Sequence, residues 1–342
     1  MASQQEIRGV YESCIGVPDL ISAISFWNQF GYRIVDHGEL SMESAKKLYN
    51  VNSKVKSVQL QHLDSDHSFI RLMQWDKPIN KGIGYTANLR HNGGRWCVLL
   101  TKSVLNILNH VEDAITKGDL WSFIMPHWLQ VYQMEKGKPF FDRPLGVREG
   151  IALHPYCRLA IFERYNYEKP TYGKIDENSF LKSSQFTHHG ILLRMDDIGS
   201  LKFYDECLGL LRQKEQNLGG KPTCSSGNQQ TFGLSSSEVY SIHDFDDPRS
   251  SLDVKGHLSG RLKIVRMFTS SEMKDVHDLS RPGSLGMSLL TYQVRDIEAY
   301  RKKVINGGAT EVTEIYENEF KEPSISFKSP DGLSWNLVGN LK

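Results

Sequence analysis

The chain has 342 residues, and its 41 basic and 40 acidic side chains leave a net charge of +1. This length predicts two domains of ordinary size, and the balanced charge argues against a nucleic-acid-binding protein. No apolar run reaches the ~18 residues that a membrane-spanning helix needs. Because the polar start MASQQEIRG also has no apolar signal segment, we expect a cytoplasmic protein with no membrane partner.

A repeated pattern of strand, helix and glycine begins near the N-terminus. Residues 12–32 and 189–209 each start with an apolar, strand-like run that leads to an aspartate, Asp19 or Asp196. Each continues through a segment of helical period with an aromatic pair and ends at a glycine. The distance from the aspartate to the glycine differs by one residue between the two copies. The aspartate is typical of a helix N-cap and the glycine of a helix C-terminus. Internal similarity of this kind predicts repeated structural modules.

Two further copies of the pattern lie at 95–118 and 287–308. The later copy keeps the whole order around Asp296, whereas the earlier one keeps strand, helix and glycine without the aspartate. Segments of strand character follow the helices, and the last two meet at an Asp331-Gly332 turn. In chain order these expected strands are 57–62, 68–75, 123–134, 147–154, 157–162, 230–234, 239–245, 309–317, 324–330 and 333–339.

The order of one strand, one helix and about three strands predicts an α+β fold of four βαβββ modules, paired into two half-barrel cups. We expect modules 1 and 2 to form an N-terminal domain at 1–167 and modules 3 and 4 a C-terminal domain at 185–342. The polar, turn-rich stretch 168–184 is expected to be a linker. Residues 246–268 are expected to be an insertion before module 4, a polar loop followed by one extra strand.

Five cysteines are scattered along the chain, and none forms a Cys-x-x-Cys pair. The sequence therefore indicates neither a structural zinc site nor a disulfide framework. We expect reduced thiols, most of them buried, at Cys14, Cys97, Cys157, Cys207 and Cys224.

The run Val17-Pro18-Asp19, the aromatic pair, the helix-ending glycine and the closing Ser329-Pro330-Asp331-Gly332 resemble the vicinal oxygen chelate superfamily. That family includes glyoxalases, bleomycin-resistance proteins and extradiol dioxygenases, and the four-module arrangement is similar to that of the dioxygenases. The resemblance covers nearly the whole chain. It implies a concave sheet around a small molecule, often with a divalent metal.

In that family the metal ligands come from the first and last strands of a module, and the first-strand ligand lies seven residues before the aspartate. Leucine has no lone pair and arginine repels a cation, so we expect no iron, manganese or zinc bound in the family's manner. An unusual metal site at His189 and His243 is the alternative. The positions that match the family's ligands are Glu12, His189, Leu289, Arg71, Arg158 and Asn336, with Ser241 and His243 in module 3.

Arg71 and Arg158 occupy equivalent places in consecutive modules, which predicts that both guanidinium groups reach one cup near Glu12. Buried arginines are costly unless they are paired, and their planar groups suit a carboxylate or a phosphate. One interpretation is therefore a site for an anionic ligand. The other is that the two arginines pair with Glu12, Glu149 or Glu163 across the module interface.

His189 is the expected catalytic residue, because a histidine can act as an acid or a base near neutral pH without a metal. The alternative is a partly buried histidine with one structural hydrogen bond. His188 should point the other way along the strand. The expected substrate-binding residues are Glu12, Arg71, Arg158, His243, Tyr292 and Asn336, although Tyr292 is also typical of a core.

Three functions are compatible with these features. The histidine and the four-module layout favour an enzyme, a lyase, isomerase or oxygenase that acts on a small polar or aromatic metabolite. The loss of metal ligands favours a non-catalytic protein of the bleomycin-resistance type that sequesters or senses a small molecule. The third function is that of an interaction protein whose cups are filled by side chains. Exposed sheet edges are compatible with a homodimer.

Overall fold

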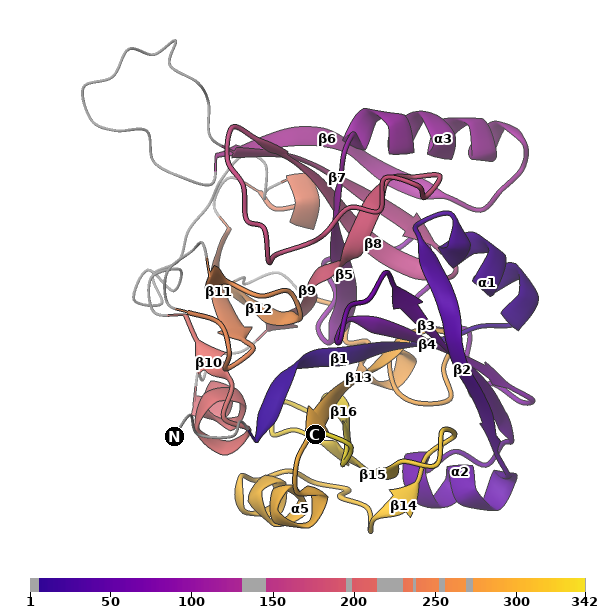
Figure 1. Cartoon of the computed structure of the whole chain (residues 1–342), viewed down its shortest axis with the longest axis vertical. Coiled ribbons are helices and arrows are strands. Elements are labelled where there is room, and N and C mark those ends of the chain that lie inside the picture. Colours follow the sequence, from indigo (N-terminus) through magenta and orange to yellow (C-terminus); the bar gives the residue numbers. More distant parts are fainter. Residues whose placement is uncertain are drawn as a thin grey trace.

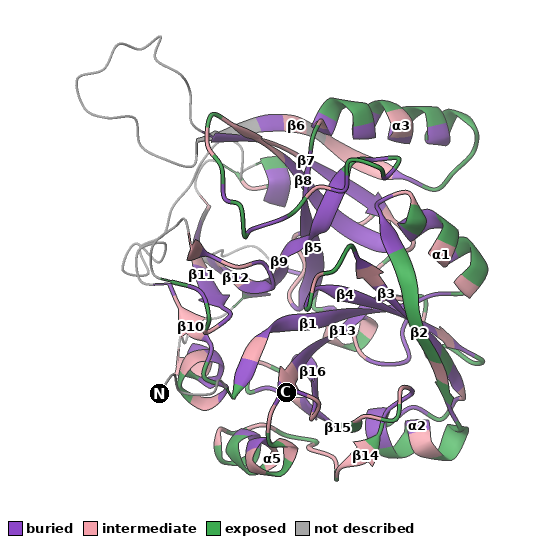
Figure 2. Ribbon diagram, viewed as in Figure 1, coloured by how far each residue is buried: buried purple, intermediate pink, exposed green. Residues whose placement is uncertain are grey.

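A computed structural model of the chain describes residues 6–130, 146–194, 199–213, 230–235, 238–251, 256–268 and 273–341. Within these ranges, two eight-stranded sheets form most of the molecule (Figure 1). Both sheets are largely buried, except at the outer strand β2 (Tyr32–Leu40), which is mostly exposed (Figure 2).

The first sheet, called the β1 sheet below, has the strand order β14-β15-β16-β13-β1-β4-β3-β2. Module 1 supplies β2 together with β1 (Ile7–Gly16), β3 (Val55–His62) and β4 (Phe69–Trp75). Module 4 supplies β13 (Gly286–Val294), β14 (Tyr316–Glu317), β15 (Pro323–Lys328) and β16 (Ser334–Val338). The two modules meet where β1 and β13 pair antiparallel.

The second sheet, the β9 sheet, has the order β10-β11-β12-β9-β5-β8-β7-β6. Module 2 supplies β5 (Gly94–Thr101), β6 (Ser122–Gln130), β7 (Gly146–His154) and β8 (Cys157–Tyr165). Module 3 supplies β9 (Ser183–Arg194), β10 (Leu211–Arg212), β11 (Val239–Asp246) and β12 (Arg261–Phe268). These modules meet at the antiparallel pair β5 and β9.

The module pairing that we expected from chain order is wrong, because module 1 pairs with module 4 and module 2 with module 3. The first strands of the modules are almost wholly buried. Their sequence patterns are therefore too similar to indicate which two strands pair. Residues 76–93 connect β4 to β5 and so cross from one sheet to the other. The stretch 168–184, expected to be an interdomain linker, instead connects β8 to β9 within one sheet.

One helical segment follows the first strand of each module. These segments are α1 (Leu20–Asn28), α3 (Val104–Thr116), the π-helical turn Phe203–Cys207 and α5 (Ile297–Asn306). The expected N-caps at Asp19 and Asp296 are confirmed, since their carboxylates accept from the amides of Ser22 at 2.7 Å and Ala299 at 2.9 Å. Asp196 lies outside the described residues. A further helix that we did not expect, α2 (Met42–Tyr49), has Ser41 as its N-cap.

The two sheets stand back to back. One apolar cluster joins α1 and α3 to both sheets, through Ile15 and Leu72 of the β1 sheet and Leu99 and Leu159 of the β9 sheet. A second cluster joins the π-helical turn and α5 to both sheets. We call the opposite side of each sheet its cup face, and each cup face has its own apolar cluster.

Three expected elements differ in the structure. Residues 230–232 form a helical turn instead of a strand, and of 309–317 only the last two residues form a named strand. Residues 246–268 do not end in an extra strand, because β12 is the last strand of module 3 and pairs with β11 and β9.

In the described ranges no helix is long and apolar enough to cross a membrane. Cys14, Cys97 and Cys157 are buried free thiols, and Cys207 is a partly exposed one. Cys224 lies outside the described residues.

Candidate functional site

A cavity of about 220 Å³ opens on the cup face of the β9 sheet. Side chains alternate between the two faces of a strand, so every second residue of β5, β8 and β12 reaches this cavity. Two non-strand segments, around residues 167–172 and 231–232, complete the wall. The apolar lining consists of Trp96, Val98, Val147, Ala160, Phe162, Phe232, Ile242 and Val265.

Two cationic side chains of β12 are neutralised by acids of β11 beneath the cavity. Arg261 donates to Asp244 at 2.8 Å and to Asp246 at 2.9 Å. Lys263 lies 3.0 Å from the Asp244 carboxylate. Both aspartates are fully buried, and despite that burial the cations hold the pKa of the Asp244 carboxyl below its usual value.

Lys169 also lines this cavity and has no carboxylate partner among the described residues. The residue is 7% exposed, and its ammonium lies 5.2 Å from the centre of the Tyr172 ring. Burial, together with Arg261 and Arg164 nearby, lowers the pKa of Lys169 to about 8. An anion bound beside Lys169 would therefore relieve an unfavourable accumulation of positive charge.

Glu149 on β7 is the acid that faces the cavity. No hydrogen bond or ion pair joins its carboxyl group to another described side chain. Burial raises the pKa of Glu149 to about 7, although Lys263 acts in the opposite direction. A carboxyl group with a pKa near neutrality can both accept and donate a proton at physiological pH.

His188 on β9 brings a neutral imidazole to the same cavity. Its Nδ1 lies 3.0 Å from the Tyr172 hydroxyl and 3.1 Å from the Thr187 hydroxyl. The Thr187 hydroxyl also donates to the Val98 carbonyl oxygen at 3.1 Å. Burial, with Lys263 and Arg261 nearby, holds the pKa of His188 well below its usual value. The ring is therefore neutral at physiological pH, and one of its two nitrogens keeps a lone pair.

His189, the expected catalytic residue, does not face a cup. Its ring lies between the two sheets, with Nδ1 2.8 Å from the Ser13 hydroxyl of β1 and Nε2 3.4 Å from the Ser68 hydroxyl. It is fully buried, and that burial lowers the pKa of His189 to about 3. The copies of the repeat could be aligned only to within one residue. On a strand, a shift of one residue moves a side chain to the opposite face, so the alignment could not distinguish His189 from His188.

The strand registers identify the positions that match the family's metal ligands. In the β1 sheet, the pairing of β1 with β13 relates Glu12 to Leu289 by an approximate two-fold axis. The parallel neighbours, β4 and β16, then relate Arg71 to Asn336. The same registers in the β9 sheet give the set His188, Trp96, Lys263 and Ala160.

Neither set fits a metal ion in the family's manner. In the β9 cup, Lys263 is a cation, and the indole of Trp96 and the methyl group of Ala160 cannot donate a lone pair. In the β1 cup the guanidinium of Arg71 occupies a ligand position. The described residues hold no group of three or more His, Cys, Asp or Glu side chains that could hold a metal. His189 and His243 are therefore not part of such a group.

Arg71 and Arg158 do not share a cup, so the expected double-arginine site is wrong. Arg71 lies in the β1 cup and pairs with Glu12 and with Glu319. Arg158 lies in the β9 sheet, where its guanidinium donates to loop carbonyl oxygens, including that of Ala87 at 3.0 Å. Of the alternative interpretation, the pairing of Arg71 with Glu12 is confirmed, but it lies within module 1 instead of across the module interface. For Arg158 that interpretation is wrong, because its partners are carbonyl oxygens.

The remaining expected binding residues do not line the β9 cavity. His243 contacts the Ser241 hydroxyl at 3.0 Å, and Asn336 donates to the Ile325 carbonyl oxygen at 2.8 Å. Tyr292 packs on Trp335 in the core between the sheets, with ring centres 5.5 Å apart.

Sequence reasoning did not assign Glu149, Lys169 or Lys263 to a site. A signal for Glu149 was present, because it lies between Val147 and Ile151 on an otherwise apolar face of its strand. Lys263 gives a similar signal on β12, which had been assigned to an insertion. Lys169 lies in a segment without periodicity, so no pattern could place it.

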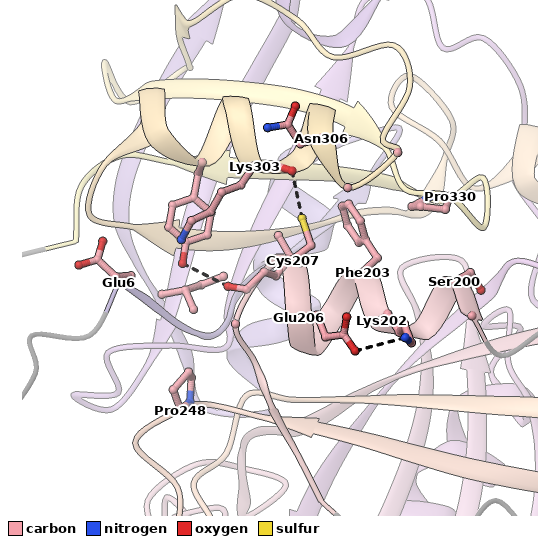
Figure 3. Close-up of a pocket in the computed structure, with 17 residues that line it drawn as sticks. Glu6, Ser200, Lys202, Phe203, Glu206, Cys207, Pro248, Lys303, Asn306 and Pro330 are labelled. Carbon is pink, nitrogen blue, oxygen red and sulfur yellow. Dashed lines mark hydrogen bonds and ion pairs between the residues drawn. The ribbon is translucent and has the colours of Figure 1, made fainter.

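A larger and more open groove, of about 1030 Å³, lies on the outer surface between the π-helical turn and α5 (Figure 3). Lys202 pairs with Glu206 at 3.6 Å, and the Cys207 thiol donates to the Lys303 carbonyl oxygen at 3.2 Å. These polar groups satisfy one another, and the groove is lined by module helices instead of a cup face. The β9 cavity is the better candidate site.

The fold is shared with solved structures, as the resemblance to the vicinal oxygen chelate superfamily predicted. Glyoxalase I from Zea mays matches 97% of this chain and 92% of its own, with a TM-score of 0.52 and 12% sequence identity. A candidate dioxygenase from Bacillus subtilis matches 98% of this chain and 86% of its own, with a TM-score of 0.50 and 12% identity. No protein-family model and no curated protein matches the chain in sequence. At this identity the likeness establishes the fold and leaves the activity to the site.

Proposed function

We propose that the chain is an enzyme, an isomerase or a lyase, that binds a small organic anion in the β9 cup and transfers a proton on it. The observation that carries this proposal is the presence of Lys169, without a carboxylate partner among the described residues, in one largely apolar cavity with Glu149. The cavity volume of about 220 Å³ exceeds the ~150 Å³ in which benzene binds an engineered cavity. A ring or a short branched chain that bears a carboxylate is a ligand of suitable size.

The side chains divide the chemistry among them. Lys169 holds the negative charge of the ligand, and the apolar wall excludes water from its body. The Glu149 carboxylate takes a proton from a carbon next to a carbonyl or carboxylate group, and the electron pair moves onto the oxygen beside Lys169. Return of the proton to another atom gives an isomer, and departure of a neighbouring group gives a lyase product. The neutral imidazole of His188 forms a hydrogen bond with the substrate and orients it.

Non-catalytic binding of the same class of ligand is the second candidate. The observation that favours it is the set of side chains at the family's ligand positions, where Trp96, Ala160 and Lys263 supply no metal donor. A binder returns its ligand unaltered, whereas a proton-transfer enzyme exchanges a carbon-bound hydrogen of the ligand with solvent.

The first experiment is a thermal-shift series of aromatic and branched carboxylates, each compared with its neutral primary amide. We expect the carboxylates to raise the melting temperature and the amides to have little effect. Lys169→Met should abolish the difference, and Lys102→Met, which removes an exposed lysine paired with Glu177, should preserve it. If no carboxylate exceeds its amide, the proposed ligand class is wrong.

The second experiment separates the enzyme from the binder. A carboxylate identified in the thermal-shift series is incubated with the protein in deuterated water, and its carbon-bound protons are followed by NMR. Enzymatic proton transfer predicts exchange or conversion that is lost in Glu149→Gln while binding persists. Binding without any exchange would identify the non-catalytic protein.

A further inference from the structure

Side chains of the β1 cup bind a carboxylate group, and this carboxylate comes from the chain itself. The carboxylate lies on the turn 318–322, which joins β14 to β15 in module 4. The turn and its hairpin lie beside α2 of module 1 (Figure 1). All the groups that receive the carboxylate come from module 1.

The turn is held in a fixed shape by Asn318, which is fully buried. Its side-chain oxygen accepts from the amides of Phe320 at 2.9 Å and Glu322 at 3.0 Å, and its amide group donates to the Glu322 carboxylate at 2.8 Å. Lys321 adopts the left-handed conformation, with φ of 64°. These bonds place Glu319 at the end of the turn that enters the cup.

Three groups bind the Glu319 carboxylate. The hydroxyls of Tyr49 on α2 and Ser57 on β3 donate to it at 2.8 Å and 2.9 Å, and the guanidinium of Arg71 on β4 donates at 3.3 Å. The Arg71 guanidinium also lies over the Phe320 ring, 5.2 Å from its centre. A guanidinium, two hydroxyls and an aromatic ring are the groups with which proteins bind small carboxylate ligands.

The turn also approaches the backbone of module 1 closely. A Cβ atom at Gly38 on β2 would lie 1.9 Å from the Glu319 carbonyl oxygen, so only glycine admits the turn at this depth. The side chains of Glu319, Arg71 and Glu12 are all fully buried. Arg71 thus serves two buried carboxylates, at the position where the family places a metal ligand.

We propose that the β1 cup is a binding site for a small monocarboxylate, which the chain fills with its own Glu319. The inference goes beyond the proposed function and does not depend on it. It explains why the two cups differ, since the turn closes the β1 cup whereas the β9 cup has a ligand-sized cavity. An external carboxylate can enter the β1 cup only where the Glu319 side chain has left.

The test is chemical rescue of Glu319→Ala by acetate, which has the two carbons and two oxygens that this substitution removes. In chloride, we expect a lower melting temperature than that of the wild-type chain, because Arg71 loses one of its two carboxylate partners and two hydroxyls lose their acceptor. At equal ionic strength, acetate should restore a few degrees in a saturable manner, and acetamide should not. The wild-type chain and Glu319→Gln, whose cups stay filled, should show no such gain.

The double variant Glu319→Ala with Arg71→Met is expected to lose the rescue. If Glu319→Ala does not fold in chloride, its refolding yield in acetate and in chloride replaces the melting curve. Recovery in acetate alone supports the inference. Equal protection by acetate and chloride, or no recovery in acetate while Glu319→Gln folds, would overturn it.

Discussion

His188 and His189 are adjacent on β9 and serve opposite faces of one sheet. His188 lines the cavity of the β9 cup, with its Nδ1 3.0 Å from the Tyr172 hydroxyl. His189 faces the other way and joins the two sheets, with its Nδ1 2.8 Å from the Ser13 hydroxyl. Mutating one histidine at a time should therefore separate an effect on stability from an effect on ligand binding.

His189→Ala should destabilise the protein without a direct effect on the cavity. The substitution leaves the buried Ser13 hydroxyl without this partner and creates a void between the sheets, which together cost about 2–4 kcal/mol of unfolding free energy. His188→Ala should cost less stability and weaken ligand binding in the thermal-shift series. Urea denaturation at pH 7 measures the first effect. A larger stability loss from His188→Ala than from His189→Ala would contradict this division.

Ligand affinity should fall as the pH rises through about 8. Lys169 has a lowered pKa of about 8, so the free protein is protonated there below this pH and neutral above it. A bound anion stabilises the protonated form, so binding above pH 8 requires proton uptake and weakens by up to about tenfold per pH unit. Calorimetric titration between pH 6 and 9.5 measures this profile. Lys169→Met should bind weakly with a flat profile, and a break that persists in this variant would exclude Lys169 as its source.

Glu149 should make the folded state less stable as the pH rises from about 4.5 to about 7. Its pKa is raised from 4.5 to about 7 by burial, so in this window the folded state holds a proton that the unfolded state has released. Stability from this group is complete below the unfolded pKa and is lost through the folded pKa. Urea midpoints at pH 5 and pH 8 should therefore differ less in Glu149→Gln than in the wild type. Glu112→Gln, at an exposed position of α3, is the control and should retain the wild-type difference.

The sequence allowed the fold to be predicted because the module signals are local. The N-caps at Asp19 and Asp296 and the left-handed glycines Gly31 and Gly209 each depend on neighbouring residues alone. The pairing of modules is different, since it depends on contacts between first strands far apart in the chain. Four buried, apolar strands do not differ enough in pattern to specify which two will pair.

The candidate site was less predictable for a related reason. The family position in module 3 was one residue from His188, and one residue changes the face of a strand that a side chain occupies. The groups that give the cavity its charge, Lys169 and Lys263, lie in segments that had been assigned to a linker and an insertion. Their role depends on burial and on the positions of Asp244 and Asp246, which spacing alone does not encode.

Arg71→Met should test the charge balance of the β1 cup. The guanidinium serves the buried carboxylates of Glu12 and Glu319, and these neighbours raise the pKa of Arg71 well above its usual value even though burial alone would lower it. Removing one partner of a buried ion pair typically costs 3–5 kcal/mol, and we expect a loss of about this size in unfolding free energy at pH 7.

The same variant has a predicted pH dependence with a definite sign. Without the guanidinium, two carboxylates stay buried beside each other with no cation to offset their charge, an arrangement that a lower pH relieves. The stability loss of Arg71→Met should therefore be smaller at pH 5 than at pH 7. Arg158→Met is the matched control, because its guanidinium donates to carbonyl oxygens that do not titrate. A loss for Arg71→Met that is independent of pH would show that Glu12 and Glu319 are not its cause.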